Sequence, residues 1–176
     1  MKKILTLTSW QIFILLLLPF VFPDSYLGLL LTIIYEGLFT YCVYFLGHSL
    51  YEKLPAGHDL KIKRLDFHLF FAWVYITIVL ILFKGGYNIN QDNYKDFGLS
   101  IYLIVPLHIF TLYCIFYVIW FIAKSIATIQ KNNVVGFGDY IGNFFLLLWF
   151  FPIGVWWIQP KVREIFSFNT EDSSYV

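Results

Sequence analysis

The chain has 176 residues, of which 60% are hydrophobic, 22% are aromatic and only 13% are charged. Soluble domains carry about 25% charged residues, and a water-soluble fold of this length could not bury so much apolar surface. The same composition excludes disordered, collagen-like and disulfide-stapled proteins. The predicted fold class is therefore all-α: a polytopic membrane helical bundle that occupies the chain as one domain.

Charge and cysteine content argue against a nucleic-acid partner and against a disulfide framework. Lys and Arg number 12 against 11 Asp and Glu, a formal charge of +1, so no basic surface for nucleic acid is expected. Cys42 and Cys114 both lie inside apolar runs, where a thiol behaves as a small hydrophobic group. We therefore expect no nucleic-acid partner and no disulfide framework.

Four apolar stretches meet or approach the roughly 20 residues needed to cross a hydrocarbon core of about 30 Å. In chain order they cover about 5–22, 26–46, 67–83 and 99–123. Backbone groups in lipid must bond within a helix or a closed barrel, and these runs lack the alternation of a barrel, so each is predicted to be a transmembrane helix. The first resembles a signal peptide but lacks a cleavage pattern, which predicts an uncleaved anchor.

A fifth apolar stretch, residues 140–158, is interrupted by Pro152 and Gly154. Proline removes a helical hydrogen bond and glycine lets the chain turn, so the stretch fits either a re-entrant segment or a kinked fifth span. Residues 159–176 are predicted to be a polar tail.

The basic residues predict the orientation, because Lys and Arg in short loops favour the cytoplasmic side. With both termini cytoplasmic, ten of the twelve basic residues lie inside, and only Lys84 and Lys95 lie outside. A fifth stretch that does not cross the membrane preserves this bias, whereas a crossing would carry Lys161 and Arg163 outside. The pattern predicts a multi-pass protein of the cell inner membrane with a cytoplasmic N-terminus, and it favours a cytoplasmic C-terminus.

Two ionisable residues are predicted to lie deep in the bilayer: Glu36 at the middle of the second stretch and His108 near the middle of the fourth. Such a group costs several kcal/mol on insertion scales, so it is either satisfied by the bundle or placed for function. In the functional interpretation, the two line a polar path for a proton or a ligand. In the structural interpretation, Glu36 donates a hydrogen bond to a carbonyl, and His108 satisfies the helix break at Pro106.

His48 and His68 are predicted to lie near the cytoplasmic ends of the second and third stretches, flanking a basic loop that contains His58. Interfacial histidines could ligate a metal or a haem. Their spacing matches no metal-binding motif, and no cysteine lies at that depth. We therefore expect no metal centre and no cofactor.

The string Val134-Val135-Gly136-Phe137-Gly138-Asp139 resembles the filter signature of potassium channels. That resemblance implies a loop whose backbone carbonyls face an ion. Val134 stands where the filter has threonine, and the charge bias places this loop inside, whereas the filter faces outside. The alternative is a glycine turn in which the Asp139 carboxylate caps the next helix by accepting from first-turn N–H groups.

The apolar ending of the chain, residues 149–161 with the string WFFPIGVWWIQPK, resembles the endings of small multi-pass membrane proteins of Bacteroidota-type bacteria. The resemblance covers the last quarter of the chain. It implies a bacterial inner membrane and brings no activity with it.

The chain contains no nucleophile elbow, phosphate-binding loop, dinucleotide fingerprint or paired-carboxylate motif, so no catalytic residue is assigned and an enzyme is not favoured. The leading hypothesis is a non-enzymatic membrane module that assembles with itself or with a partner membrane protein. The alternative is a pore, a transporter or a membrane-perturbing effector, such as a defence-associated one, in which Glu36 and His108 line a path. A third hypothesis is a membrane-bound haem or metal enzyme that uses the histidines.

Overall fold

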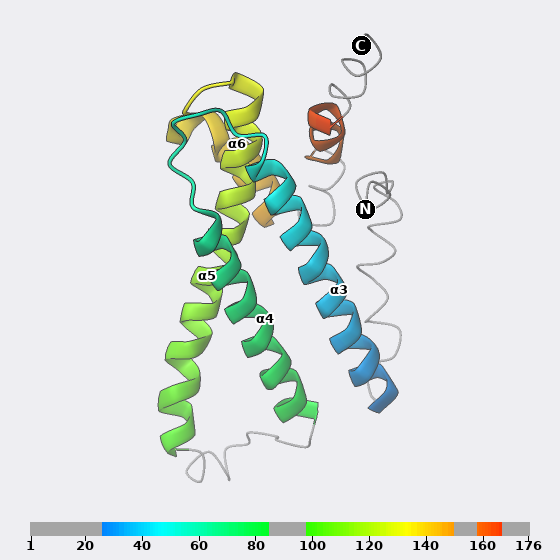
Figure 1. The fold of residues 1–176 in the computed structure, drawn as a ribbon. Helices are drawn as coiled ribbons and strands as arrows, with labels where there is room; N and C mark the ends of the chain where they lie inside the picture. The colour runs from blue at the N-terminus through cyan, green and yellow to red at the C-terminus, as the bar shows by residue number, and fades with distance from the viewer. Residues whose placement is uncertain (1–25, 85–97, 150–157, 167–176) are drawn as a thin grey trace.

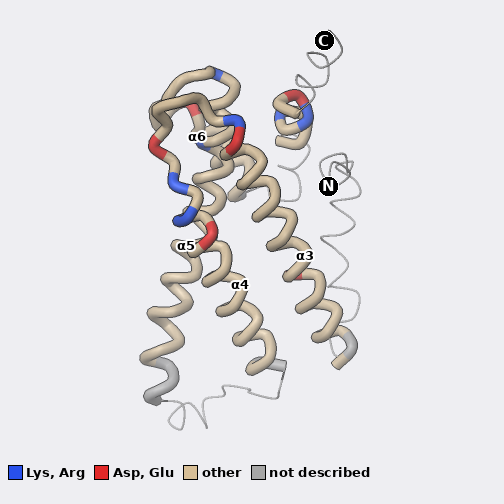
Figure 2. The backbone as a smooth tube through the Cα atoms, viewed as in Figure 1, with Lys and Arg blue, Asp and Glu red and all other residues tan. Residues whose placement is uncertain are grey.

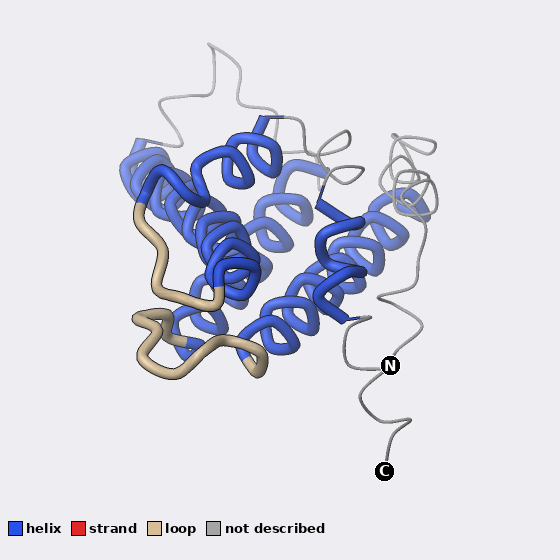
Figure 3. The backbone as a smooth tube through the Cα atoms, turned by 90° about the horizontal axis from the view of Figure 1, so that it is seen from above, coloured by secondary structure: helices blue, strands red, loops and turns tan. Residues whose placement is uncertain are grey.

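The computed structural model describes residues 26–84, 98–149 and 158–166, and these residues form helices and no strands (Figures 1 and 3). The all-helical prediction is confirmed for this part of the chain, whereas the first predicted stretch, 5–22, lies outside it. The helices are α3 (Tyr26–Tyr51), α4 (Ile62–Lys84), α5 (Gly98–Lys131), α6 (Phe137–Trp149) and a short helix over 158–166.

Three of the described helices are long and apolar enough to cross a membrane: Gly28–Tyr51, Ile62–Leu82 and Tyr102–Lys131. They overlap the second, third and fourth predicted stretches and are compatible with a membrane protein. The 34 residues of α5 rise about 51 Å at 1.5 Å per residue, roughly 20 Å more than a hydrocarbon core. One end of α5 therefore has the length to extend beyond the apolar layer.

The fifth predicted stretch begins as α6, whose 13 residues rise only about 20 Å. Residues 150–157, which contain Pro152 and Gly154, lie outside the described residues. Residues 158–166 join the last residue of the fifth stretch to the start of the predicted polar tail, and they form a helix because Ile158, Val162 and Ile165 recur at helical spacing and are buried.

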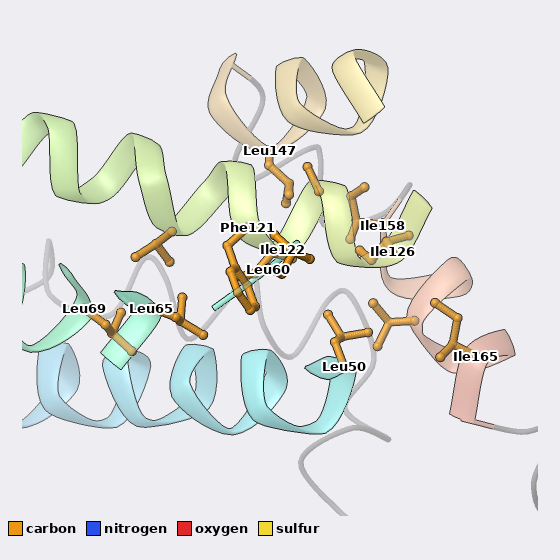
Figure 4. Packing of buried hydrophobic residues seen from close by; sticks show 13 residues of the cluster. Leu50, Leu60, Leu65, Leu69, Phe121, Ile122, Ile126, Leu147, Ile158 and Ile165 are labelled. Carbon is orange, nitrogen blue, oxygen red and sulfur yellow. The ribbon is translucent and has the colours of Figure 1, made fainter. Parts of the chain in front are cut away.

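The main hydrophobic core lies at one end of the bundle, where α3 ends, α4 begins and α5 ends (Figure 4). Helix α6 and the 158–166 helix cover this region, which we call the packed end. Its buried cluster consists of Leu50, Leu60, Leu65, Leu69, Val118, Phe121, Ile122, Ala123, Ile126, Leu147, Ile158, Val162 and Ile165.

Away from the packed end, α3, α4 and α5 spread apart, with α4 between the other two (Figure 1). We call this the open region: residues 26–45, 70–82 and 102–116. Most of its large apolar side chains on α3 and α5 are exposed or half-buried, including Leu38, Ile109 and Tyr113. Apolar side chains on such helices gain little by packing together when lipid surrounds them, so these faces suit lipid or a protein partner.

The reversal between α5 and α6 is a local helix-ending motif. Asn132 has a φ of 49°, in the left-handed region that Asn tolerates better than most residues. The N–H of Asn133 donates to the Thr128 carbonyl at 3.3 Å, and that of Asn132 to the Ile129 carbonyl at 3.2 Å, which together form a Schellman motif. The turn directs α6 back along the last part of α5 (Figure 1).

Glycine permits a close approach of α3 to α4 at the packed end. A Cβ atom added at Gly47 would clash with Cδ2 of Leu65, which is fully buried. No side chain larger than hydrogen fits there without movement of Leu65, so Gly47 fixes the spacing of the two helices.

Candidate functional site

A polar cluster joins α3 to α4 in the open region. The Thr77 hydroxyl donates to Oε2 of Glu36 at 3.5 Å, while Oε1 of Glu36 is buried and has no hydrogen-bond partner in the part of the chain that the structure describes. Nε1 of Trp73, one turn before Thr77, is also buried and unbonded, and it lies 3.8 Å from the position of a Cβ added at Gly37. The cluster thus contains an unused carboxyl oxygen and an unused N–H donor, groups that can hold a proton or a small hydrogen-bonding ligand.

His108 lies on the other side of α4. Its Nδ1 is 3.3 Å from the hydroxyl of Tyr75, and the same hydroxyl donates to the carbonyl of Ile104 at 3.3 Å. That carbonyl lies two residues before Pro106, where the proline interrupts the hydrogen bonds of α5. The imidazole itself is exposed.

Helix α4 separates the two deep ionisable residues. Their partners, Thr77 and Tyr75, are two positions apart, so they leave the helix about 200° apart, on nearly opposite sides. Glu36 therefore reaches α4 from α3, and His108 reaches it from α5. The structure gives each residue its own partner, and one copy of the chain does not present the two as a facing pair.

The histidines near the packed end also have separate partners. Nε2 of His48 is 2.8 Å from the Asp66 carboxylate, a pair that links α3 to α4. The His68 ring stacks on Tyr117 with the centroids 4.1 Å apart. Within the described ranges, no three His, Cys, Asp or Glu side chains gather as metal ligands.

Sequence reasoning missed a buried cation at the packed end. The side chain of Lys124 is only 9% exposed; its Nζ is 2.6 Å from the Asp59 carboxylate and 5.2 Å from the centroid of the Trp120 ring. The hydrogen bond from Lys124 lowers the pKa of Asp59 below its usual value. The pair ties the connection between α3 and α4 to α5. The sequence signal that could have indicated this burial is that Lys124 is followed by an amphipathic run, Ser125 to Lys131.

The glycine-containing loop forms the start of α6. The Asp139 carboxylate accepts from the Gly136 N–H at 2.9 Å, and its other oxygen is hydrogen-bonded to Lys131. Helix α6 begins at Phe137, so Gly136 is the cap residue and Asp139 is the third residue of the helix. From this position an acidic side chain can reach back to the N–H of the cap residue. The hydrogen bond from Lys131 lowers the pKa of Asp139 most, and the bond from the Gly136 N–H lowers it further. The loop therefore has the geometry of a helix cap. The Asp139 carboxylate accepts from the N–H of the cap residue, Gly136, and not from a first-turn N–H.

Charged residues of the described part gather at the packed end and on the 158–166 helix (Figure 2), whereas Glu36 lies within the apolar length of α3. Two further lysines hold the packed end together: Lys53 donates to the carbonyl of Ile165 at 3.0 Å, and Lys161 donates to Oδ1 of Asn143 at 2.7 Å. No protein-family model, curated protein or solved structure matches this chain, so the functional argument rests on its own residues.

Proposed function

We propose that the chain is a small multi-pass integral membrane protein of a bacterial inner membrane, and that it acts as a non-enzymatic assembly module. The observation that carries the proposal is that His108 is exposed within the apolar part of α5, as the seventh residue of that part, which starts at Tyr102. A polar side chain at this depth costs free energy when it faces lipid, and a protein partner that hydrogen-bonds it removes part of that cost.

The division of the molecule supports this proposal. At the packed end, buried side chains and the Lys124–Asp59 pair hold the helices together. In the open region, α3 and α5 present long apolar faces. A module of this kind presents helices to a second copy or to another membrane protein.

The assembly is tested by counting chains in native membranes. Fluorescently labelled protein is extracted directly into polymer-bounded lipid discs at low expression, and the photobleaching steps per disc are counted. We expect two or more chains per disc, or one chain with a stoichiometric partner. Single chains without a stoichiometric partner would overturn the proposal.

The proposed orientation places the packed end and the N-terminus in the cytoplasm, supported by the basic residues at that end (Figure 2). Ala56 is exposed in the connection between α3 and α4. A cysteine at Ala56, in a chain with Cys42 and Cys114 replaced by alanine, should react with a membrane-impermeant maleimide only after the inner membrane is permeabilised. Labelling of Ala56→Cys in intact spheroplasts would show that the orientation is the reverse of the proposed one.

One observation favours a second candidate function, transport of a proton or a cation. The Oε1 atom of Glu36 is buried and unbonded within an apolar helix, a placement typical of intramembrane transport sites. Proteoliposomes with a pH-sensitive dye inside test this candidate. Transport predicts a flux that Glu36→Gln abolishes while folding is retained, and that Glu52→Gln, a change at an exposed acid, leaves intact. An equal flux from both variants would exclude a role for Glu36.

A further inference from the structure

We infer that the start of α4 binds the headgroup of an anionic phospholipid through Lys61, Lys63 and Arg64, with the acyl chains along Phe67 and Phe70. The inference rests on the membrane insertion in the proposed function and does not depend on the assembly. The three basic side chains are exposed and fall within four consecutive residues. Figure 2 shows Lys and Arg gathered where the connection from α3 enters α4.

The three basic side chains differ from the other lysines of the packed end in their bonding. In the part of the chain that the structure describes, no hydrogen bond or ion pair engages the side chain of Lys61, Lys63 or Arg64. The other lysines described at that end each donate to a protein oxygen: Lys53, Lys124, Lys131 and Lys161. The cations at the start of α4 are therefore available to an anion from outside the chain.

The acids beside this positive charge have other partners. The first turn of α4 contains no acidic residue. Asp59, just before the helix, bonds to Lys124, and Asp66, in the second turn, pairs with His48. Positive side chains at the N-terminal end of a helix also oppose its dipole. An anion bound at the start of α4 would therefore stabilise both the side chains and the helix end.

The length of α4 places these cations at the boundary of the apolar layer. Residues 65–83 lie between Arg64 and Lys84 and rise about 28 Å at 1.5 Å per residue, close to a hydrocarbon thickness of about 30 Å. Long basic side chains near the end of a membrane helix extend toward the headgroup layer. This placement holds for either orientation of the chain in the membrane.

Helix α5 places the boundary at the same level. Arg64 is close enough to Tyr117 of α5 to act electrostatically on its hydroxyl. From Tyr117 to Lys131, α5 rises about 21 Å, which matches the length by which this helix exceeds the apolar layer. Tyrosine is enriched at membrane–water interfaces because its ring is apolar and its hydroxyl is polar. The two helices therefore agree that Arg64 lies at headgroup level.

The face of α4 that leads from the cations into the apolar layer suits acyl chains. Phe67 and Phe70 are 55% and 64% exposed. They follow Lys63 by four and seven residues, so the three side chains share one face of the helix. A phospholipid joins an anionic phosphate to apolar chains, and this face joins cations to apolar rings in the same order. A free phosphate would use only the cations, so the site fits the lipid better.

Native mass spectrometry of the purified chain in detergent tests the site. The micelles are titrated with phosphatidylglycerol or with phosphatidylcholine of the same acyl chains, and the bound lipids are counted. We expect phosphatidylglycerol to bind more tightly, and Arg64→Gln to weaken its binding about 5-fold, the usual contribution of one cation near an anionic lipid surface. Lys131→Gln is the matched control, because it removes the same charge at a lysine that already pairs with Asp139. Equal binding of the two lipids, or equal losses from the two variants, would overturn the inference.

Two measurements on the native chain complete the test without any variant. The preference for phosphatidylglycerol should fall as the ionic strength rises, because the cations are exposed to solvent ions. Inorganic phosphate, at the concentration at which the lipid saturates the site, should not displace the lipid, because it lacks the acyl chains. A preference that salt leaves unchanged would contradict the role of charge. Displacement by phosphate would overturn the assignment to a lipid.

The outcomes also separate this inference from the proposed function. If discs contain two or more chains but the two lipids bind equally, the assembly proposal stands and the lipid site falls. If discs contain one chain without a partner but phosphatidylglycerol is preferred, the lipid site stands and the assembly falls. If alkaline carbonate releases the chain from membranes as a soluble protein, both fall.

Discussion

The packed end and the open region are built from the same three helices, but among the described residues only the packed end has a continuous hydrophobic core. Along α5, the side chains from Phe121 to Thr128 are all buried, whereas most of those from Tyr102 to Phe116 are exposed. The difference indicates two surroundings. Burial from water gives the packed end its stability. Where lipid surrounds helices, apolar burial contributes little, and polar bonds and shape decide which helices meet.

The largest difference in unfolding free energy is expected between the same substitution made at two leucines. Leu65→Ala at the packed end removes a side chain with no exposed surface and should cost about 2–5 kcal/mol of unfolding free energy. Leu103→Ala, at a side chain that is 67% exposed, should change the unfolding free energy by about 0.5 kcal/mol or less. Equilibrium unfolding in detergent, followed by tryptophan fluorescence, measures both. Equal losses would mean that stability is not concentrated at the packed end.

The next largest effect is expected at the ion pair that ties the α3–α4 connection to α5. Asp59→Ala leaves the buried Lys124 ammonium without its carboxylate. Hydrogen bonds to charged groups contribute about 1.5–3 kcal/mol, and the exposure of Asp59 reduces that value, so we expect a loss of about 1–2 kcal/mol. Glu52→Ala, an exposed acid nearby, is the control and should have little effect.

The same pair predicts a pH dependence. The folded-state pKa of Asp59 lies below its unfolded value of 3.8, so the unfolded chain binds the proton more readily. The contribution of Asp59 is therefore complete above that unfolded pKa and is lost as the pH falls through the folded pKa. The stability difference between the native chain and Asp59→Ala should be constant from about pH 7 to pH 5 and shrink below about pH 4. A difference that stays constant at pH 3 would contradict this assignment.

A smaller effect is expected where α3 approaches α4. Gly47→Ala should cost about 1 kcal/mol, because the clash with Leu65 outweighs the better helix propensity of alanine. The double variant with Leu65→Ala should lose less than the sum of the two single losses, because the clash has been removed. Gly142→Ala in α6 meets no atom within 4 Å and should be neutral or stabilising. Stabilisation by Gly47→Ala would show that the helices can separate.

The smallest effect is expected at the start of α6. Asp139→Asn keeps an acceptor for the Gly136 N–H but removes the charge that faces Lys131. We expect a small loss of thermal stability that salt reduces in the native chain, because both charged groups are accessible to ions. A large loss, insensitive to salt, would assign Asp139 a role beyond the cap.

The all-helical fold was predictable because an apolar run of span length in lipid must be helical. The extent of α5 was not. The fourth stretch was placed at 99–123 because Lys124 marks a polar end, yet the helix continues to Lys131 because Ile126 and Ala127 keep the helical spacing and pack at the packed end. Hydropathy detects contact with lipid, whereas this segment is buried by protein.

That Glu36 and His108 lie within long apolar helices could be predicted from the sequence, but their partners could not. Which residues they meet depends on the rotation of α4 about its axis, which sends Thr77 toward α3 and Tyr75 toward α5. Contacts that accompany this rotation, such as the close approach of Gly47 to Leu65, join residues on different helices. A single sequence contains no local signal for such a contact.

Helix α5 runs from Gly98 to Lys131 with Pro106 inside it, and one end of it lies in the open region while the other forms the centre of the packed end. Lys124 lies on this helix, and Asp59 of the α3–α4 connection is held to it. A rotation of α5 that reaches Lys124 would therefore also displace the connection between the other two long helices.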